Sequence, residues 1–405
     1  MLGCDAFWNT FWNLNQFWNL VTPEWSSRWV NSQLAMYDAN GWLAKGPAGM
    51  NYIPVMVGEH EIPLIVSAWQ MGIRDFDAKK ALEASVKMQT TPAQKVFKGF
   101  AGNRDLTAYM EHHYVPYDKG RFSNTMEYSY DDWTVGQLAK ALGDEETYRT
   151  FNDRGYWWRN VISDEGYCHM RDSKGQWLEN FDPFRSGANQ HYVEGNAWQL
   201  TFFVPQDPYG LIEAMGGDEP FRAKIDSLFR VSGDMGPHAS ADISGLIGQY
   251  AHGNEPGHHT VYLYAYAGQQ WKTARMVRRI LNEMYTDRPN GLAGNEDCGQ
   301  MSSWYVLSAM GFYPVNPSLG IYVLGSPKFA EMTIRTGNGK KFTVKAEGNS
   351  ERNIYIQSAE LNGKPYPYAY IRHSDIVKGG TLRLTMGPQP NREFGAAPEH
   401  RPFER

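Results

Sequence analysis

Apolar residues recur at three- and four-residue steps over most of the first 315 residues, the pattern of helices that bury one face. The first such run covers residues 6–18. Further helices are expected at 59–72, 78–86, 124–143, 144–158, 197–203, 207–215, 218–230, 258–267, 270–284 and 300–310. Short connections between consecutive helices favour antiparallel hairpins. Periodicity alone leaves open whether these hairpins close into a toroid or stack into a solenoid.

The segment Asn124-Thr-Met-Glu127 predicts how one of these helices begins. A short polar side chain followed three residues later by glutamate is typical of a capping box, in which both side chains bind backbone N–H groups of the first turn. We therefore expect Glu127 to cap the start of its own helix.

After residue 315 the period of the pattern changes to two. Alternating or β-branched runs are separated by the turn sequences Gly-Asn-Gly, Asn-Gly-Lys and Gly-Gly. The runs cover 329–335, 341–346, 353–361 and 381–386. The whole pattern predicts a mainly α protein, with a helical domain over 1–317 and a β-rich, sandwich-like region over 318–390. Residues 391–405 carry many charges and are expected to form a surface tail.

Composition excludes several classes of protein. A hydrophobic content of 42%, a charged content of 20% and a net charge of −5 indicate a folded core and no affinity for nucleic acid or anionic membrane. No apolar run reaches the roughly 18 residues that a membrane span needs. The three cysteines form neither a disulfide framework nor a zinc set, and the first residues lack a signal-peptide pattern.

Aromatic residues are abundant, with 14 Trp, 24 Tyr and 19 Phe. Their ring faces stack on sugars, so the abundance suggests a carbohydrate ligand. A large helical core also uses many aromatic residues, and that explanation is the better one for most of them.

The segment Tyr192-Val-Glu-Gly-Asn-Ala-Trp-Gln199 is the first of three that are too polar and irregular for their surroundings. Glu194 stands just before a predicted helix among apolar neighbours, a setting that raises a carboxyl pKa and suits a general acid. The alternative is that Glu194 only caps the helix, where the helix dipole favours a negative charge.

The second segment, His252-Gly-Asn-Glu-Pro-Gly-His-His259, holds three imidazoles, one amide and one carboxylate around a turn. Its histidines lack the spacing of a zinc site on one helix face. The oxygens of Asn254 and Glu255 suit a hard cation. A loop held together by histidine and asparagine hydrogen bonds is the alternative.

The third segment, Gly294-Asn-Glu-Asp-Cys-Gly-Gln-Met301, places two carboxylates between glycines at the start of a helix. One acid could cap that helix, but capping does not account for both. Together with Glu194, a carboxylate from this loop would form the pair that hydrolyses glycosides. A separation of about 6.5–9.5 Å would admit a water molecule and invert the configuration.

These three segments resemble the sequences of glycoside hydrolase family 92, the exo-acting α-mannosidases. The matching strings are Glu194-Gly-Asn-Ala-Trp-Gln199, His252-Gly-Asn-Glu-Pro256 and the run from Gly294 to Tyr305. The resemblance covers nearly the whole chain. It implies an (α/α)6 toroid of helical hairpins and a calcium-dependent, inverting exo-α-mannosidase that removes terminal α-linked mannose from glycans.

The resemblance also implies roles for individual residues. The general acid falls on Glu194 and the general base on Asp297. A second acidic position of the family falls on Asn295, whose amide can orient water but cannot take up a proton. Ligands of the Ca2+ ion are expected at Asn254 and Glu255. The expected substrate-binding residues are Trp8, Asn9, Trp198, His252 and His258.

Two departures from the family bear on its expected properties. The chain reads Trp8-Asn9-Thr10 where the family usually has Trp-Asp-Thr, which puts simple α-1,2-linked mannose in doubt as the substrate. The N-terminal β-sandwich domain of family members is also missing from this sequence. The family's usual location is periplasmic or extracellular. A sugar-binding relative without turnover, and a toroid glycosidase acting on another hexoside, are the alternative functions.

Overall fold

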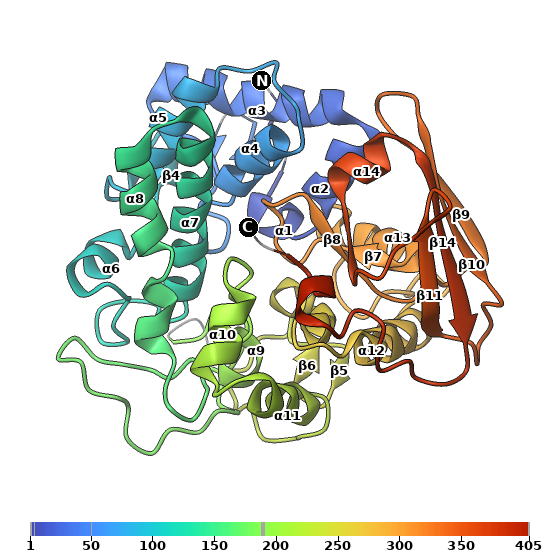
Figure 1. Cartoon of the computed structure of the whole chain (residues 1–405). Helices are drawn as coiled ribbons and strands as arrows, with labels where there is room; N and C mark the ends of the chain where they lie inside the picture. The colour runs from blue at the N-terminus through green and yellow to red at the C-terminus, as the bar shows by residue number, and fades with distance from the viewer. Residues whose placement is uncertain (1, 4, 50, 188–190, 404–405) are drawn as a thin grey trace.

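The computed structural model describes residues 2–3, 5–49, 51–187 and 191–403. Helices dominate the chain up to Met310, and sheets follow (Figure 1). The α-helices are α1 (Phe7–Thr10), α2 (Leu14–Val21), α3 (Pro23–Asn40), α4 (Glu61–Gln70), α5 (Ala78–Met88), α6 (Leu106–His112), α7 (Asn124–Leu142), α8 (Glu145–Arg154), α9 (Ala197–Leu200), α10 (Pro208–Ala214), α11 (Asp218–Leu228), α12 (Gln270–Glu283), α13 (Gln300–Met310) and α14 (His373–Val377). Most predicted helices are present with shifted ends, and α7 and α8 lie side by side as the expected hairpin.

Three local predictions differ from the structure. The run at 6–18 is divided into α1 and α2, because Phe11–Asn13 form a turn between them. Helix α3 was not expected, since its many Ser and Asn residues give no clear apolar stripe. The stretch at 258–267 forms the 3-10 helix η3 (Thr260–Ala265) rather than an α-helix; the other 3-10 helices are η1 (Trp157–Val161), η2 (Glu255–Gly257) and η4 (Pro398–His400).

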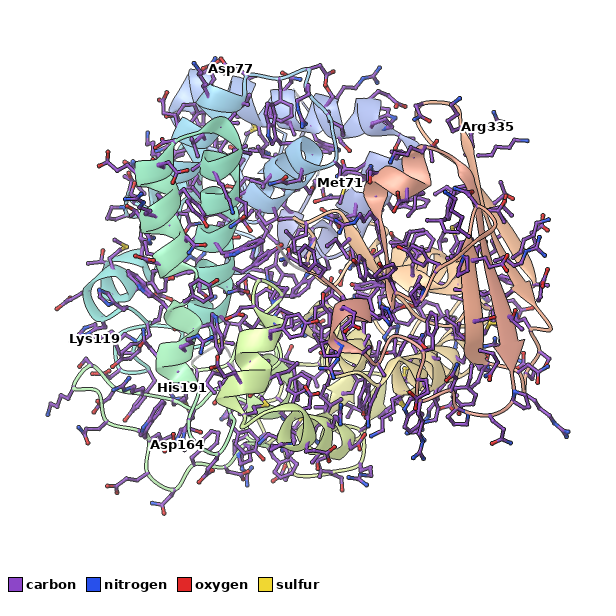
Figure 2. The ribbon with its side chains drawn as sticks, in the orientation of Figure 1. Met71, Asp77, Lys119, Asp164, His191 and Arg335 are labelled. Carbon is purple, nitrogen blue, oxygen red and sulfur yellow. The ribbon has the colours of Figure 1, made fainter. Side chains whose placement is uncertain are left out.

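The C-terminal region contains two sheets, as its period of two predicts. A five-stranded sheet has the order β12-β11-β14-β10-β9, and a three-stranded sheet has the order β13-β8-β7. Their strands are β7 (Phe312–Tyr313), β8 (Ile321–Leu324), β9 (Glu331–Arg335), β10 (Lys341–Glu347), β11 (Tyr355–Leu361), β12 (Lys364–Pro365), β13 (Tyr370–Arg372) and β14 (Gly380–Gly387). The neighbouring strands β10 and β14 are parallel, and the other pairs are antiparallel. In Figure 2, Arg335 marks the outer edge of the larger sheet.

Three short hairpins interrupt the helical part. They are β1–β2 (Pro47–Ala48 and Asn51–Tyr52), β3–β4 (Gln94–Val96 and Gly99–Ala101) and β5–β6 (Leu246–Ile247 and Tyr250–Ala251). Hairpin β5–β6 leads directly into the His252–His259 segment and so positions it. Among the described residues, no helix is both long and apolar enough to cross a membrane.

The apolar core continues from the helices into the sheets. Leu20 of α2 and Leu307 of α13 belong to the same buried cluster as Phe342 and Leu384 of the larger sheet. Burial of large apolar side chains contributes roughly 1.5–3 kcal/mol each, so this shared cluster joins the two parts firmly.

The last residues are tied to the helical part (Figure 1). Arg401 forms an ion pair with Asp218 of α11 at 2.9 Å, and Tyr209 of α10 donates a hydrogen bond to the carbonyl of Pro402 at 2.7 Å. The segment expected as a surface tail therefore lies on the surface but is held by specific contacts.

Candidate active site

Glu194 and Asp297 both have left-handed backbone conformations, with φ of 50° and 52°. Residues other than glycine adopt this conformation rarely, at a cost of about 1–3 kcal/mol, and mainly where surrounding contacts enforce it at functional sites. The contacts around Glu194 are visible. Ser123 Oγ accepts from the backbone N–H of Val193 at 2.9 Å, and Asn254 Nδ2 donates to the carbonyl of Glu194 at 2.8 Å.

Glu194 does not cap the helix that follows it. Asn196 and Gln199 form the capping box of α9, with each side chain bonded to the other residue's backbone N–H. A Cβ atom on Gly195 would lie 2.1 Å from Leu200 Cδ2, so a larger residue between the acid and the cap would displace the Leu200 side chain. The carboxyl of Glu194 is therefore left for another role.

Burial raises the pKa of Glu194 to about 7. The negative charges of Asp242, Asp297 and Glu127 act in the same direction, while a hydrogen bond from Asn254 opposes them. Glu194 therefore keeps its proton on a substantial fraction of molecules at neutral pH, as a general acid requires.

Glu194 lies in the wall of a small cavity that Tyr250, Asn254 and Thr260 also line. His191, three residues earlier, accepts at its carbonyl from the N–H of Ser123 at the start of α7. In Figure 2, His191 accordingly appears near the lower end of that helix.

Asp297 is half-buried in the loop between Gly294 and Gly299. Its neighbour Glu296 accepts two hydrogen bonds from Ser302, at the backbone N–H and at Oγ, and so serves the start of α13. A Cβ on Gly294 would lie 2.4 Å from the carbonyl oxygen of Gly253, so glycine lets this loop approach the His252–His259 segment closely.

Glu255 is buried beside Asp297. Burial, followed by the hydrogen bond and negative charge of Asp297, raises the pKa of Glu255 well above its usual range. Asn9 Nδ2 donates to Glu255 Oε1 at 3.1 Å and acts in the opposite direction. The structure therefore brings together three predicted site residues from distant parts of the chain.

The donor set near Glu255 partly fits a calcium ion. Two adjacent carboxyl groups repel each other when ionised, and a hard cation would relieve that repulsion. Asn254 Nδ2 is committed to Glu194, which leaves Oδ1 as its atom for a cation. No cluster of three or more His, Cys, Asp or Glu side chains suited to a metal occurs in the described part of the chain. Any further ligands would be amide, carbonyl or water oxygens.

His252 and His258 are fully buried. The ring of His252 is hydrogen-bonded to the hydroxyls of Tyr250 and Tyr285, and His258 Nε2 is bonded to the carbonyl of His252. Burial lowers both pKa values, that of His258 to about 3, so both rings are neutral. These contacts favour holding the loop over touching a sugar, and direct contact stays a prediction.

The tryptophans proposed for sugar stacking are also buried. Trp8 is 2% exposed and Trp198 is 6% exposed. The indole N–H of Trp8 donates to Glu127 at 3.1 Å, while Trp198 has its ring beside Tyr167. Stacking needs an open ring face, so these two side chains resemble core residues more than a binding platform.

Asp242 was missed by sequence analysis. Its Oδ1 accepts from Asn295 Nδ2 at 3.1 Å, and its charge is the first of those that raise the pKa of Glu194. Asn295 thus lies at the site, bonded to a carboxylate. A single aspartate in a loop carries no spacing signal, and only the fold brings Asp242 near the other acids.

The capping box predicted for Glu127 is wrong. Helix α7 begins without a side-chain cap, and Glu127 instead accepts hydrogen bonds from Trp8, Gly58 and His60. Tertiary contacts provide these donors, so the local pattern could not reveal them.

Comparison with known proteins gives consistent matches. A model of the glycosyl hydrolase family 92 catalytic domain matches residues 3–388. A family GH92 alpha-mannosidase from Bacteroides thetaiotaomicron, solved in complex with mannoimidazole, has 36% sequence identity and a TM-score of 0.91, over 98% of this chain and 52% of that one. A family GH92 inverting mannosidase from Bacteroides thetaiotaomicron VPI-5482 has 34% identity and a TM-score of 0.89, over 98% and 55%.

A curated fungal relative is similar in sequence. An uncharacterized secreted glycosidase from Arthroderma benhamiae is 29% identical over 435 residues, which cover 95% of this chain and 54% of the relative. The chain therefore spans about half the length of the proteins it matches.

Proposed function

Because this chain belongs to glycosyl hydrolase family 92, we propose that it is an inverting exo-α-mannosidase with Glu194 as general acid and Asp297 as general base. The observation that carries the proposal is the raised pKa of Glu194, about 7, beside the carboxylate of Asp297. Both residues have left-handed backbone conformations, and hydrogen bonds from Val193 to Ser123 and from Asn254 to Glu194 hold the one at Glu194. The likeness to two mannosidases supports mannose as the sugar.

In the proposed reaction Glu194 protonates the glycosidic oxygen while the bond from that oxygen to the anomeric carbon breaks. A water molecule attacks the opposite face of that carbon and gives its proton to Asp297, so the configuration inverts. Asn295, held by Asp242, would orient the water through its amide oxygen. Proton exchange with solvent restores both carboxyl groups.

We further propose a Ca2+ ion held by Glu255 and by Asn254 Oδ1. When bound, a calcium ion supplies positive charge and coordination sites for hydroxyl groups. The hydrogen bond from Asn9 to Glu255 Oε1 leaves Oε2 of Glu255 as the atom proposed to bind the ion. We also propose that the helical hairpins close into an (α/α)6 toroid around the site. The same proposal includes a β-sandwich partner domain and an exported location.

The proposal is tested by measuring the release of mannose from α-mannobiosides, with calcium and with EDTA. NMR then identifies the anomer of mannose that is formed first. The proposal expects calcium-dependent release of β-mannose. Full activity in EDTA would contradict the proposed role of calcium. Release of α-mannose would contradict the proposed inverting mechanism. Release of another hexose would favour the different-hexoside alternative. Mannose binding without release would favour the alternative of a sugar-binding protein.

Glu194→Gln tests the acid directly. Glutamine keeps the shape of glutamate but cannot donate the catalytic proton, so we expect kcat to fall by about 10²–10⁴ while mannose affinity is retained. The kcat and the ligand dissociation constant are measured on the same preparation. Near-normal turnover would show that another group is the acid.

A further inference from the structure

The carboxylate of Glu127 joins three segments that are far apart in sequence. Its Oε2 accepts from the N–H of Gly58 at 3.2 Å, from His60 Nε2 at 3.0 Å and from the indole N–H of Trp8 at 3.1 Å. All these groups are buried. Several N–H donors on one carboxyl group restrict its orientation, so the position of the Glu127 side chain is fixed.

His60 is itself held in place by a second carboxylate. Its Nδ1 is 2.7 Å from Asp131 Oδ1, and Phe11 stacks on its ring at 4.0 Å. Burial alone would lower the pKa of His60, but the carboxylates of Asp131 and Glu127 raise it to about 9. The imidazolium then donates from both nitrogens, one to each carboxylate.

The same contacts continue toward the active site through α1. Trp8, fixed by Glu127, is followed in the chain by Asn9, whose Nδ2 donates to Glu255 Oε1 at 3.1 Å. Glu255 in turn contacts Asp297. One continuous path therefore runs from Asp131 through His60, Glu127, α1 and Glu255 to the proposed base.

We propose that Glu127 is a positioning residue, which orients Asn9 onto Glu255 by holding the indole of Trp8. The inference rests on the proposed function, because Glu255 matters through its neighbour Asp297. A residue serving only to start α7 would bind that helix's own N–H groups, whereas Glu127 binds α1, Gly58 and His60.

Trp8→Phe is the selective test, because it deletes the indole N–H and leaves Glu127 its bonds to Gly58 and His60. The matched control is Trp158→Phe, since Trp158 is equally buried and its indole N–H has no hydrogen-bond partner in the structure. Both variants lose similar volume, but only Trp8→Phe loses an indole hydrogen bond.

Steady-state kinetics give the first readout. We expect Trp8→Phe to lower kcat roughly tenfold with KM nearly unchanged, because a small displacement of a catalytic group slows chemistry more than binding. Asn9→Ala should have a similar effect, and the double variant should be no slower than Asn9→Ala alone. Multiplicative effects, or equal losses in Trp8→Phe and Trp158→Phe, would overturn the proposal.

Amide hydrogen exchange gives a second readout that does not need turnover. Exchange over residues 7–13 should accelerate in Trp8→Phe and stay at the wild-type rate in Trp158→Phe. Equal exchange in the two variants would overturn the positioning role even if the wild type releases no mannose. Absence of mannose release with the predicted exchange difference would count against the proposed function alone.

Discussion

Glu194 holds its proton for two reasons, burial and the charges around it, and mutation can separate them. The backbone turn sets the burial, whereas Asp242, Asp297 and Glu127 contribute the charges. Asp242 is the most useful of the three to change, because its charge acts most strongly and it is not itself assigned to the acid or base step. Asparagine in its place could still accept the hydrogen bond from Asn295.

We expect Asp242→Asn to move the alkaline limb of the kcat/KM profile to lower pH. A general acid works while protonated, so activity is lost as pH rises through its pKa, which is about 7 in the wild type. Removing a neighbouring negative charge lowers that pKa and should reduce kcat/KM at pH 7 by roughly twofold to tenfold.

The pH profile of Asp164→Asn is the control, since Asp164 is exposed and is not among the charges that act on Glu194. An unshifted alkaline limb in Asp242→Asn would mean that Asp242 does not act on the acid.

Sequence reasoning proposed Glu194, Asp297 and Glu255 because each stands in a polar segment that breaks an apolar pattern, and the structure brings Glu255 next to Asp297. It could not reveal Asp242 or the contacts of Glu127, because their partners come from other elements. The burial of His252 was equally invisible, since a histidine-rich loop looks the same whether its rings face solvent or a hydrogen-bonded core.

At the scale of elements, the turn that begins α4 buries several ionisable side chains. Glu59 and Glu61 are both fully buried, and Lys45 Nζ lies 2.5 Å from Glu59 Oε1. Burial and the charge of Glu59 raise the pKa of Glu61 well above its usual value. Glu61 therefore stays protonated in the folded protein at pH values where it would ionise in the unfolded chain.

Glu61→Gln should stabilise the protein at neutral pH. A carboxyl whose folded pKa is raised costs nothing below its unfolded value near 4.3, and stability is lost as pH rises from there toward the folded value. Glutamine cannot ionise and can donate to Glu59. We expect Tm at pH 7.5 to rise by about 2–4 °C, with the gain vanishing near pH 4.

Thermal melts of Glu61→Gln and wild type across this pH range make the measurement. A gain that is the same at pH 4 and pH 7.5 would show that the effect is one of packing and that ionisation plays no part.

Most helices and the β-rich region followed from periodicity, because α5, α12 and strands such as β10 bury one face each. Helix α3 was not predicted, because few of its apolar residues recur at three- or four-residue spacing and its formation depends on tertiary contacts. The division of the first helix into α1 and α2 was also unpredictable, because the apolar steps continue through the turn at Phe11–Asn13.

At the scale of the whole molecule, the C-terminal segment connects the sheet region back to the helices. Arg401 is bonded to Asp218 of α11 and to the carbonyl of Tyr266, and the backbone N–H of Ala369 donates to the carbonyl of His400. Charge and proline content predicted the surface location of this segment but not its attachment.

Arg401→Ala should weaken this connection without affecting turnover at low temperature. Loss of charge-assisted hydrogen bonds that are largely shielded from solvent is expected to cost about 1–2 kcal/mol. Limited proteolysis should then cut the chain beyond residue 390 faster than in wild type, with unchanged kcat. Lys95→Ala, at an exposed position in β3, is the control. Equal cleavage rates in the two variants would show that the ion pair does not restrain the segment.

The left-handed turns at Glu194 and Asp297 also have an evolutionary consequence. Glycine adopts this backbone without strain, so under the proposed function each acid is retained at a cost in stability that selection for hydrolysis offsets. A lineage released from that selection would gain stability by mutation to glycine at either position. Descendants that kept the fold as a lectin or a scaffold should therefore carry glycine or asparagine at positions 194 and 297. These substitutions should appear before substitutions in the surrounding core.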